Sequence, residues 1–349
     1  MPVWNKAITK PYRHFLALSV SLYRLGRPMN ANVETLFPGR DEVYDSIVDL
    51  IPGPNNPTPM VRIGPRFNER ADFELLVKLE GMNPFGSIKD RTAHFMLKGL
   101  QLEEGQSLVE PSAGNTGIAL AALANAQNTP IEVALPEGAP EEKKEQLRFL
   151  GAEVIEVEDE LCPIYPSEGA RGVVKSMVES EAYDGRYVSP NQYESELNVA
   201  AHYHSTGPEI WRQTGGRIDY FFSTIGTGGT ITGVGRFLKE RNPNIKVIGV
   251  EPAHRHHKLS GLKRVTGLPE DHFPKILDRD VVDEFISVSD EDAFKAGIRV
   301  ARTDGVLVGP TTGAVLHAAS EWSRNNAGTA VVISADNAAK YLSAYAEYL

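Results

Sequence analysis

The stretch SLVEPSAGNTGIALAALANAQNTPIEVALPEG, residues 107–138, indicates the fold class. It begins as a strand, turns through small residues at 112–117, continues as an apolar helix over 118–127 and returns as a strand at 131. A strand, a helix and a second strand in succession are typical of proteins with parallel sheets. The stretch therefore predicts an α/β protein.

The same alternation continues on both sides of this stretch. It predicts a helix that ends at Gly151, a third strand–turn–helix junction in VLVGPTTGAVLHAA (306–319), and a Pro- and Asn-rich linker over 49–64. Further strands are expected at 73–80, 152–158, 219–226, 246–252 and 330–337. Because parallel sheets bind ligands beyond the carboxyl ends of their strands, the loops after SLVE and DYFFST are the places to look for a site.

Length and charge exclude several classes of protein. The 349 residues are enough for two domains, and the net charge of −10 argues against nucleic acid as the main partner. Cys162 is the single cysteine, so no intrachain disulfide forms and a cytoplasmic location is expected. No apolar run spans a membrane. Near the N-terminus one helical face carries Phe15, Leu18, Leu22 and Leu25, which predicts an amphipathic helix; membrane-surface binding is the weaker alternative.

A lysine in EGMNPFGSIKDRTA (80–93) stands out by its position. Pro84 and Gly86 predict a turn, and the residues from Arg91 onward predict a helix. Lys89 lies at the junction, where the helix macrodipole favours anions over cations. A role other than capping is therefore worth considering, although an exposed turn lysine is the alternative.

Two glycine loops have the character of anion sites. EPSAGNTGIALA (110–121) joins a strand to a helix N-terminus that suits a carboxylate or phosphate, with a capped turn as the alternative. STIGTGGTITGVG (223–235) has five small residues in a row, Gly226 to Thr230, without the spacing of a P-loop or a dinucleotide fold. With Lys89 and the hydroxyls of Thr311 and Thr312, these loops provide an amine, a phosphate cup and a partner for a ring nitrogen. Pyridoxal phosphate needs all three.

The motifs NPFGSIKDR, EPSAGNTGIALA, GTGGTITG and VGPTTGA stand in an order that resembles the cysteine synthase and cystathionine β-synthase family, over residues 50–345. The resemblance implies a fold-type II pyridoxal phosphate enzyme, with two open parallel-sheet domains, the cofactor in the cleft between them, and a homodimer. The small domain would span 85–194 and the large one 50–84 plus 195–349, after an N-terminal extension of 1–49.

The resemblance also implies roles for individual residues. Lys89 would form the Schiff base and move the Cα proton, and Asn115 would contact the pyridoxal 3′-oxygen. The cofactor phosphate would bind to Gly226, Thr227, Gly228, Gly229 and Thr230, with Thr311 at the ring nitrogen. The substrate carboxylate would bind to Ser112, Gly114, Asn115, Thr116 and Gln192. Ala113 replaces a common serine, Thr-Thr replaces Ser-Ser or Ser-Thr at 311–312, and Asn337 receives no role.

The expected reaction is a β-replacement that makes L-cysteine from O-phosphoserine or O-acetylserine and sulfide or another sulfur donor. The basic segment EPAHRHHKLSGLKRVTG (251–267) suggests that Lys263 or Arg264 binds an anionic group, and a solvated basic loop is an equal alternative. A metal is not expected at His254, His256 and His257, because no carboxylate or cysteine has ligand spacing.

Other functions remain open. The same motifs fit cystathionine β-synthase, enzymes that make S-sulfocysteine or diaminopropionate-type products, a serine/threonine dehydratase, or a silent scaffold. A sulfur-carrier protein is a candidate partner. The leaving group, the nucleophile, and the roles of residues 1–49 and of Cys162 are not decided by the sequence.

Overall fold

A computed structural model describes residues 43–112, 114–158, 169–269 and 272–349 of the chain. Residues 1–45 and 46–349 are separate units, and the helices and strands of the described residues belong to the second unit. The predicted N-terminal amphipathic helix, Ala113 and Cys162 lie outside the described residues.

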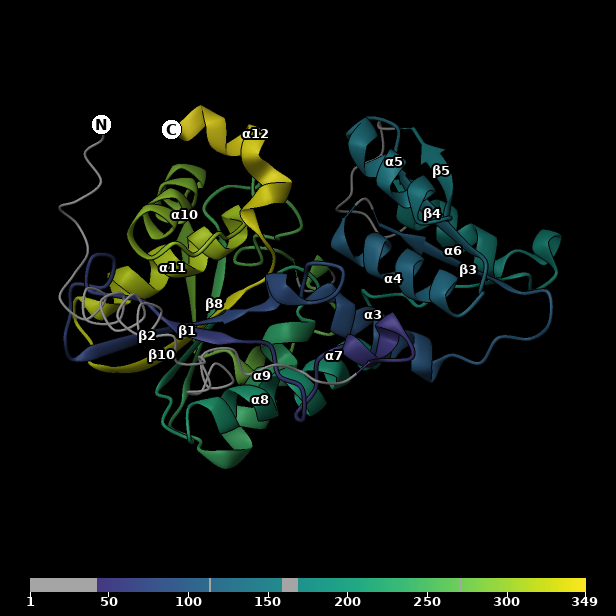
Figure 1. The fold of residues 1–349 in the computed structure, drawn as a ribbon. Coiled ribbons are helices and arrows are strands. Elements are labelled where there is room, and N and C mark those ends of the chain that lie inside the picture. The colour runs from purple at the N-terminus through teal and green to yellow at the C-terminus, as the bar shows by residue number, and fades with distance from the viewer. Residues whose placement is uncertain (1–42, 113, 159–168, 270–271) are drawn as a thin grey trace, which may run out of the picture. The chain divides into compact units, whose positions relative to one another are not determined.

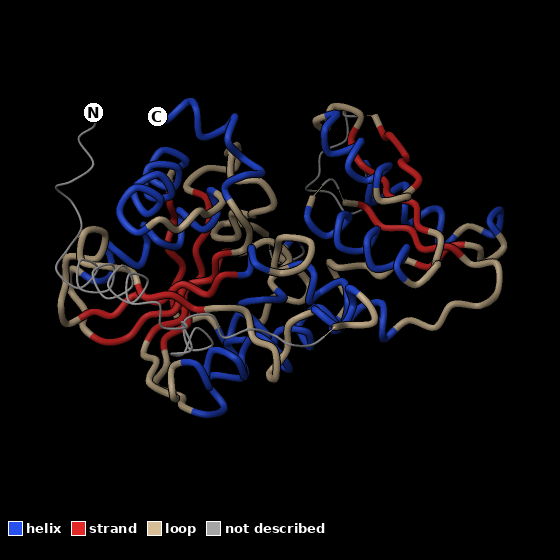
Figure 2. Tube along the Cα trace, viewed as in Figure 1, coloured by secondary structure: helices blue, strands red, loops and turns tan. Residues whose placement is uncertain are grey.

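Six of the described strands form one sheet, in the order β1-β2-β10-β7-β8-β9. Strands are drawn in red in Figure 2. Every neighbouring pair is parallel except β1 and β2, which are antiparallel. Parallel pairing follows from the helix that separates most of these strands along the chain. The strands are β1 (Met60–Arg62), β2 (Phe73–Leu79), β7 (Tyr220–Thr224), β8 (Lys246–Pro252), β9 (Glu284–Val288) and β10 (Gly328–Ser334).

Helices cover both faces of this sheet (Figure 1). On one face lie α10 (Asp290–Asp304) and α11 (Pro310–Ser323), and on the other lie α8 (Gly207–Gln213) and α9 (Gly229–Arg241). Successive residues of a strand point to opposite faces, so Phe222 joins the core beside α11 and Phe221 joins the core beside α9. Burial on both faces explains why the inner strands β7, β8 and β10 are rich in apolar residues.

The other four strands form a second, fully parallel sheet in the order β5-β4-β3-β6. Leu108 faces a core with α3, α4 and α5, whereas the next residue, Val109, faces a core with α6. The strands are β3 (Ser107–Pro111), β4 (Ile131–Pro136), β5 (Glu153–Val157) and β6 (Tyr187–Val188). The helices are α3 (Lys89–Gly99), α4 (Asn115–Ala126), α5 (Glu141–Phe149) and α6 (Gly169–Glu179).

The predicted α/β class is confirmed, with corrections to single elements. The helix expected from Arg91 begins at Lys89, and residues 306–309 form no strand although α11 follows them. The expected linker contains β1, and β6 and β9 were not predicted. The four-stranded sheet uses residues 107–188 and the larger sheet uses 60–79 and 220–334, while the proposed division into two domains remains a prediction. The remaining helices and turns are η1 (Ile47–Leu50), η2 (Glu80–Met82), η3 (Glu181–Tyr183), α7 (Glu196–Ala201), the π-helical turn η4 (His202–Thr206), η6 (Arg279–Val281), η7 (Ala338–Tyr341), α12 (Leu342–Tyr345) and η8 (Ala346–Tyr348).

Helix α3 is fixed to the six-stranded sheet by a fully buried group of charges. Arg91 pairs with Glu80 at 2.7 Å and with Glu209 of α8 at 2.6 Å, and Lys78 of β2 pairs with Glu209 at 2.6 Å. The two positive and two negative charges balance, and Thr58 and Gln213 complete the hydrogen bonds. Buried charges are tolerated when they are paired in this way. The group therefore fixes the helix that begins at Lys89.

Candidate active site

Lys89 is the first residue of α3 and is only partly exposed. The turn before it is closed by Asp90, whose carboxylate accepts the Phe85 N–H at 2.6 Å. Burial lowers the pKa of Lys89 to about 8. Its ammonium group forms no hydrogen bond or ion pair with the described residues, so the structure supplies nothing that holds it in the charged state. These are properties of a reactive amine.

The glycine loop after β7 leads into α9 and has the form of an anion cup. Gly228 has a φ of +93°, and no side chain caps the helix N-terminus, so the first N–H groups of α9 are free for a ligand. A Cβ on Gly229 would lie 2.2 Å from Oδ1 of Asn198, so only glycine fits there. The hydroxyls of Thr227 and Thr230 contact Asn198 and His202, respectively.

The second glycine loop, after β3, meets the segment that contains Gln192. Thr116 donates a hydrogen bond to Gln192 at 2.7 Å, so two predicted substrate residues lie together. The buried carboxylate of Glu110 accepts the N–H groups of Asn191 and Gln192, and burial raises the pKa of Glu110 to about 7. Ser112 acts within the loop, because its hydroxyl accepts the Gly117 N–H at 3.0 Å.

The end of β10 connects Lys89 with the hydroxyl turn of α11. Ala335 accepts the N–H of Ile88 at 2.8 Å and donates its own N–H to the Thr312 hydroxyl at 3.2 Å. The hydroxyl of Thr311, by contrast, makes no hydrogen bond to the described residues. Thr311 rather than Thr312 is thus available to a ligand.

Asn115, the first residue of α4, is held by side chains from beyond β10. Its amide donates to Asp336 at 2.7 Å and its carbonyl oxygen accepts from Lys340 at 2.7 Å. Tyr341 also donates to Asp336 at 2.6 Å, and burial raises the pKa of that carboxyl. Asp336 and Lys340 were not predicted as site residues. Their position directly after a parallel strand is the signal that would have found them.

The two basic residues singled out in the sequence differ in their surroundings. Lys263 lies 5.3 Å above the ring of Tyr193, and the guanidinium of Arg171 lies 4.2 Å from the same ring. Burial, and then the charge of Arg171, lower the pKa of Lys263 to about 8. Arg264 instead donates to the carbonyl of Ala253 at 2.7 Å.

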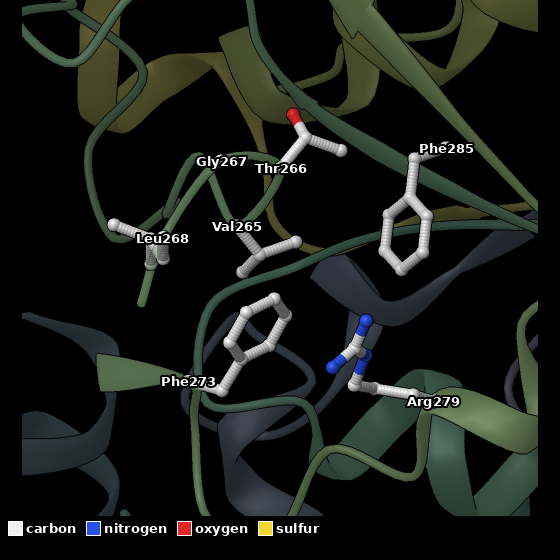
Figure 3. Close-up of a pocket in the computed structure, with 7 residues that line it drawn as sticks. All are labelled: Val265, Thr266, Gly267, Leu268, Phe273, Arg279 and Phe285. Atoms are coloured by element: carbon white, nitrogen blue, oxygen red, sulfur yellow. The ribbon is translucent and has the colours of Figure 1, made fainter. Parts of the chain in front are cut away.

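A separate surface pocket lies beside these residues and contains none of the predicted site residues. It is lined by residues that follow Arg264 and by three larger side chains, Phe273, Arg279 and Phe285. The Arg279 guanidinium lies 4.5 Å from the ring of Phe273 and points toward the space between the two phenylalanine rings (Figure 3). The lining residues are Val265, Thr266, Gly267, Leu268, Phe273, Arg279 and Phe285.

No three His, Cys, Asp or Glu side chains in the described residues are grouped as metal ligands would be, and His257 uses its Nδ1 to accept the Leu259 N–H. No helix in the described part of the chain has the length and hydropathy needed to cross a bilayer.

These residues fit pyridoxal phosphate. The cup before α9 suits its phosphate, the unpaired amine of Lys89 suits its aldehyde, and the free hydroxyl of Thr311 suits its ring nitrogen. The hydrogen bonds through Ala335 and through Thr92, His202 and Thr230 connect these three parts of the site.

Comparison with known proteins agrees with this assignment. The family model described as "Pyridoxal-phosphate dependent enzyme" matches residues 51–336. The chain is 39% identical to the cysteine synthase of Aquifex aeolicus over 313 residues, which cover 86% of this chain and 93% of that protein. It is 36% identical to cysteine synthase B of Pseudomonas aeruginosa over 305 residues, or 86% and 96% of the two chains.

A solved structure shows the same fold. The cysteine synthase of Entamoeba histolytica has a TM-score of 0.75 and 31% identity, with 87% of this chain and 91% of that chain covered. The predicted fold-type II architecture and its cofactor, pyridoxal phosphate, are therefore confirmed. With a family model that spans most of the chain, the chain belongs to the family of pyridoxal-phosphate-dependent enzymes.

Proposed function

We propose that the protein is a cysteine synthase that replaces the β-substituent of an activated serine with sulfide. The observation that carries this proposal is the unpaired, partly buried amine of Lys89, connected by hydrogen-bonded segments to an anion cup and to a carboxylate site. The related cysteine synthases match 86% of this chain, with 39% and 36% identity over the matched residues. The bond from Cβ to the leaving oxygen breaks, and a bond from Cβ to sulfur forms.

The chain's own residues divide the work. The free N–H groups of Asn115 and Thr116 at the start of α4, with Gln192, bind and orient the substrate carboxylate. Lys89, with a pKa of about 8, has a neutral fraction near physiological pH, so it takes the proton from Cα and later returns it. When bound, pyridoxal phosphate supplies the electron sink for this proton transfer.

We further propose that the leaving group is an anion, as in O-phosphoserine. Support comes from the cation pair of Lys263 and Arg171 on the ring of Tyr193, the residue after Gln192. The Lys263 ammonium has no ion pair among the described residues. Arg171 has a long ion pair, with 3.9 Å between its guanidinium and the carboxylate of Glu194. A phosphate between two such cations gains charge-assisted hydrogen bonds that an acetyl ester cannot form. Arg264 is not part of this proposal, because its guanidinium donates a hydrogen bond to a main-chain carbonyl.

Kinetics of the Lys263→Ala variant test the leaving group. We expect kcat/KM with O-phosphoserine to fall about 10- to 100-fold, because one hydrogen-bonded charge is lost, while kcat/KM with O-acetylserine stays within about twofold. The control is Lys275→Ala, which removes an exposed cation from nearby Glu194. An equal fall with both substrates would discard the anionic leaving group and keep the enzyme class.

A visible spectrum of the purified protein tests the enzyme class itself. Absence of any cofactor band, even after pyridoxal phosphate is added, would overturn the role of Lys89. Three finer expectations from the family resemblance remain proposals: a homodimer, a cytoplasmic location and a sulfur-carrier protein as sulfur donor.

A further inference from the structure

We propose that Asn198 and His202 are positioning residues that direct the hydroxyl protons of Thr227 and Thr230 toward the cofactor phosphate. Both side chains are completely buried behind the glycine loop. The inference rests on the proposed assignment of that loop. It also gives a reason for the burial of these two polar side chains, which take part in none of the buried ion pairs of the described residues.

The amide of Asn198 has a partner for each of its hydrogen-bonding groups. Its nitrogen donates to the main-chain oxygen of Gln192 at 2.8 Å and to the Thr227 hydroxyl at 3.1 Å, and its oxygen accepts from Thr92 at 3.2 Å. The orientation of the amide is therefore fixed. Because the Thr227 oxygen accepts from Asn198, its own proton is free to be donated to an anion in the loop.

His202 does the same for Thr230. Burial, and then the charges of Lys89 and Arg91, lower the pKa of His202 to about 3, so the ring is neutral. Its Nδ1 lies 3.0 Å from the Thr206 hydroxyl, and its Nε2 lies 3.2 Å from the hydroxyls of both Thr92 and Thr230.

The hydrogen-bond count selects one tautomer of this ring. The proton of Thr92 already goes to Asn198, so Thr92 can only accept from His202. The ring therefore carries its proton on Nε2, and Thr206 donates to Nδ1. Thr230 then shares the single Nε2 proton with Thr92 in a three-centre hydrogen bond, and the hydroxyl proton of Thr230 points into the loop.

The same network joins the two ends of the cofactor site. Thr92 lies one turn after Lys89 on α3, and Thr230 lies in the first turn of α9. His202 is in hydrogen-bond contact with both, from a π-helical turn of a kind that often occurs at functional sites. The spacing between the amine and the phosphate cup is thus fixed by α7 and η4, which carry neither group.

Close packing keeps this support in place. A Cβ on Gly229 would lie 2.2 Å from Asn198 Oδ1, and one on Gly233 would lie 2.9 Å from Cβ of His202. Two glycines of α9 therefore allow α7 and η4 to approach the loop from behind. Asn198 and His202 act on the phosphate only through the threonines that they contact.

The test compares two ligands of the apoprotein, pyridoxal phosphate and pyridoxal, which lacks the phosphate. In Asn198→Ala and His202→Leu, affinity for pyridoxal phosphate should fall about 10- to 100-fold, because each change frees one hydroxyl proton to turn away from the anion. Affinity for pyridoxal should change by no more than about twofold. His202→Gln, whose amide can donate from the position of Nε2, should restore most of the affinity.

Ser205→Ala is the matched control, because Ser205 is buried on the same π-helical turn and its hydroxyl binds only the Ala201 carbonyl. It should leave both affinities unchanged. Thr230→Val tests the loop itself. If that variant does not lose affinity for pyridoxal phosphate relative to pyridoxal, the assignment of the phosphate loop is wrong. If it does while Asn198→Ala and His202→Leu do not, only the positioning role is wrong.

A measurement on the unmodified holoenzyme decides the case if the variants do not fold. Nitrogen-15 NMR of the His202 ring should show a proton on Nε2 when pyridoxal phosphate is bound. A proton on Nδ1 would turn the Thr230 hydroxyl toward the ring and overturn the inference.

Discussion

At the scale of single residues, burial decides which form of a titratable side chain is present. Lys89 is placed where its charge is disfavoured and no carboxylate offsets that cost, so burial alone lowers its pKa to about 8. An exposed lysine on the same helix, such as Lys98, has no such environment. The difference separates a reactive amine from an ordinary surface lysine.

The rate at which the apoprotein captures pyridoxal phosphate should therefore rise with pH. Only the neutral amine attacks an aldehyde, and the neutral fraction of Lys89 increases as the pH passes about 8. The measurement is the growth of the absorbance band of the bound cofactor after mixing, at a series of pH values. Lys89→Met should abolish this band and Lys98→Met should keep both rate and midpoint. A midpoint near 10, the value of an exposed lysine, would contradict the burial of Lys89.

The neutral state of the His202 ring predicts that the folded protein loses stability in acid. Its pKa in the folded protein is about 3, below that of an unfolded histidine, so the unfolded state binds more protons as the pH falls below about 6.5. Stability from this group is complete above about pH 6.5 and is lost toward pH 3. Between pH 6.5 and 5 the loss is about 2 kcal/mol.

Urea unfolding of wild type and His202→Gln at about pH 7 and pH 5 measures this loss. The variant should lose about 2 kcal/mol less on acidification, because glutamine does not titrate and all other groups are shared. Equal losses in the two proteins would mean that His202 is not buried as a neutral ring.

At the scale of the element, helix α3 depends on Arg91. Removal of this side chain leaves two buried carboxylates, Glu80 and Glu209, and Lys78 is then the only cation of this buried group that remains to balance them. Arg91→Ala should lower the free energy of unfolding by about 3–5 kcal/mol. Chemical denaturation measures the change. Arg62→Ala is the control, because its pair with Glu74 is exposed and is worth less than about 1 kcal/mol. A cost for Arg91→Ala as small as that of the control would show that the buried charges do not hold α3.

The elements also show what the sequence could predict and why. Strands buried on both faces, such as β4 and β10, are long apolar runs and were predicted, whereas β1 and β6 are too short for any periodicity. Helix α3 begins before its expected start because Asp90 closes the preceding turn, which no pattern of apolar residues records. The apolar run at 306–309 buries Val308 in the core without pairing with a strand.

The same limit applies to the candidate site. The residues predicted to touch the ligand lie in short local motifs, so one stretch of sequence was enough to identify each motif. Asn198, His202 and Lys340 act through partners that are distant in the sequence, Lys340 through Asn115, for example, 225 positions away. Contacts of this kind form only when the chain folds, and no spacing of residues along the sequence predicts them.

In the molecule as a whole, hydrogen bonds of Asn115 connect the two sheets. This residue begins α4, which packs on the four-stranded sheet, yet both ends of its amide are bound by residues that follow β10 of the larger sheet. Lys340 is an exposed residue, and partial burial lowers the pKa of its ammonium group. The start of α4, whose free N–H groups we propose bind the substrate carboxylate, is thereby held in place.

Lys340→Met should loosen that end of α4 without disturbing either core. The variant removes a charged donor to Asn115. Loss of the stabilisation from a hydrogen bond of this type should make local opening of α4 about tenfold more frequent. Hydrogen exchange of the apoprotein measures this: amides in the first turns of α4 should exchange faster, and those of β10 should not. Lys295→Met, which removes an exposed partner of Glu291 on α10, is the control. Unchanged exchange in α4 would mean that Asp336 alone holds Asn115, and faster exchange throughout both sheets would mean that Lys340 supports the fold rather than the substrate loop.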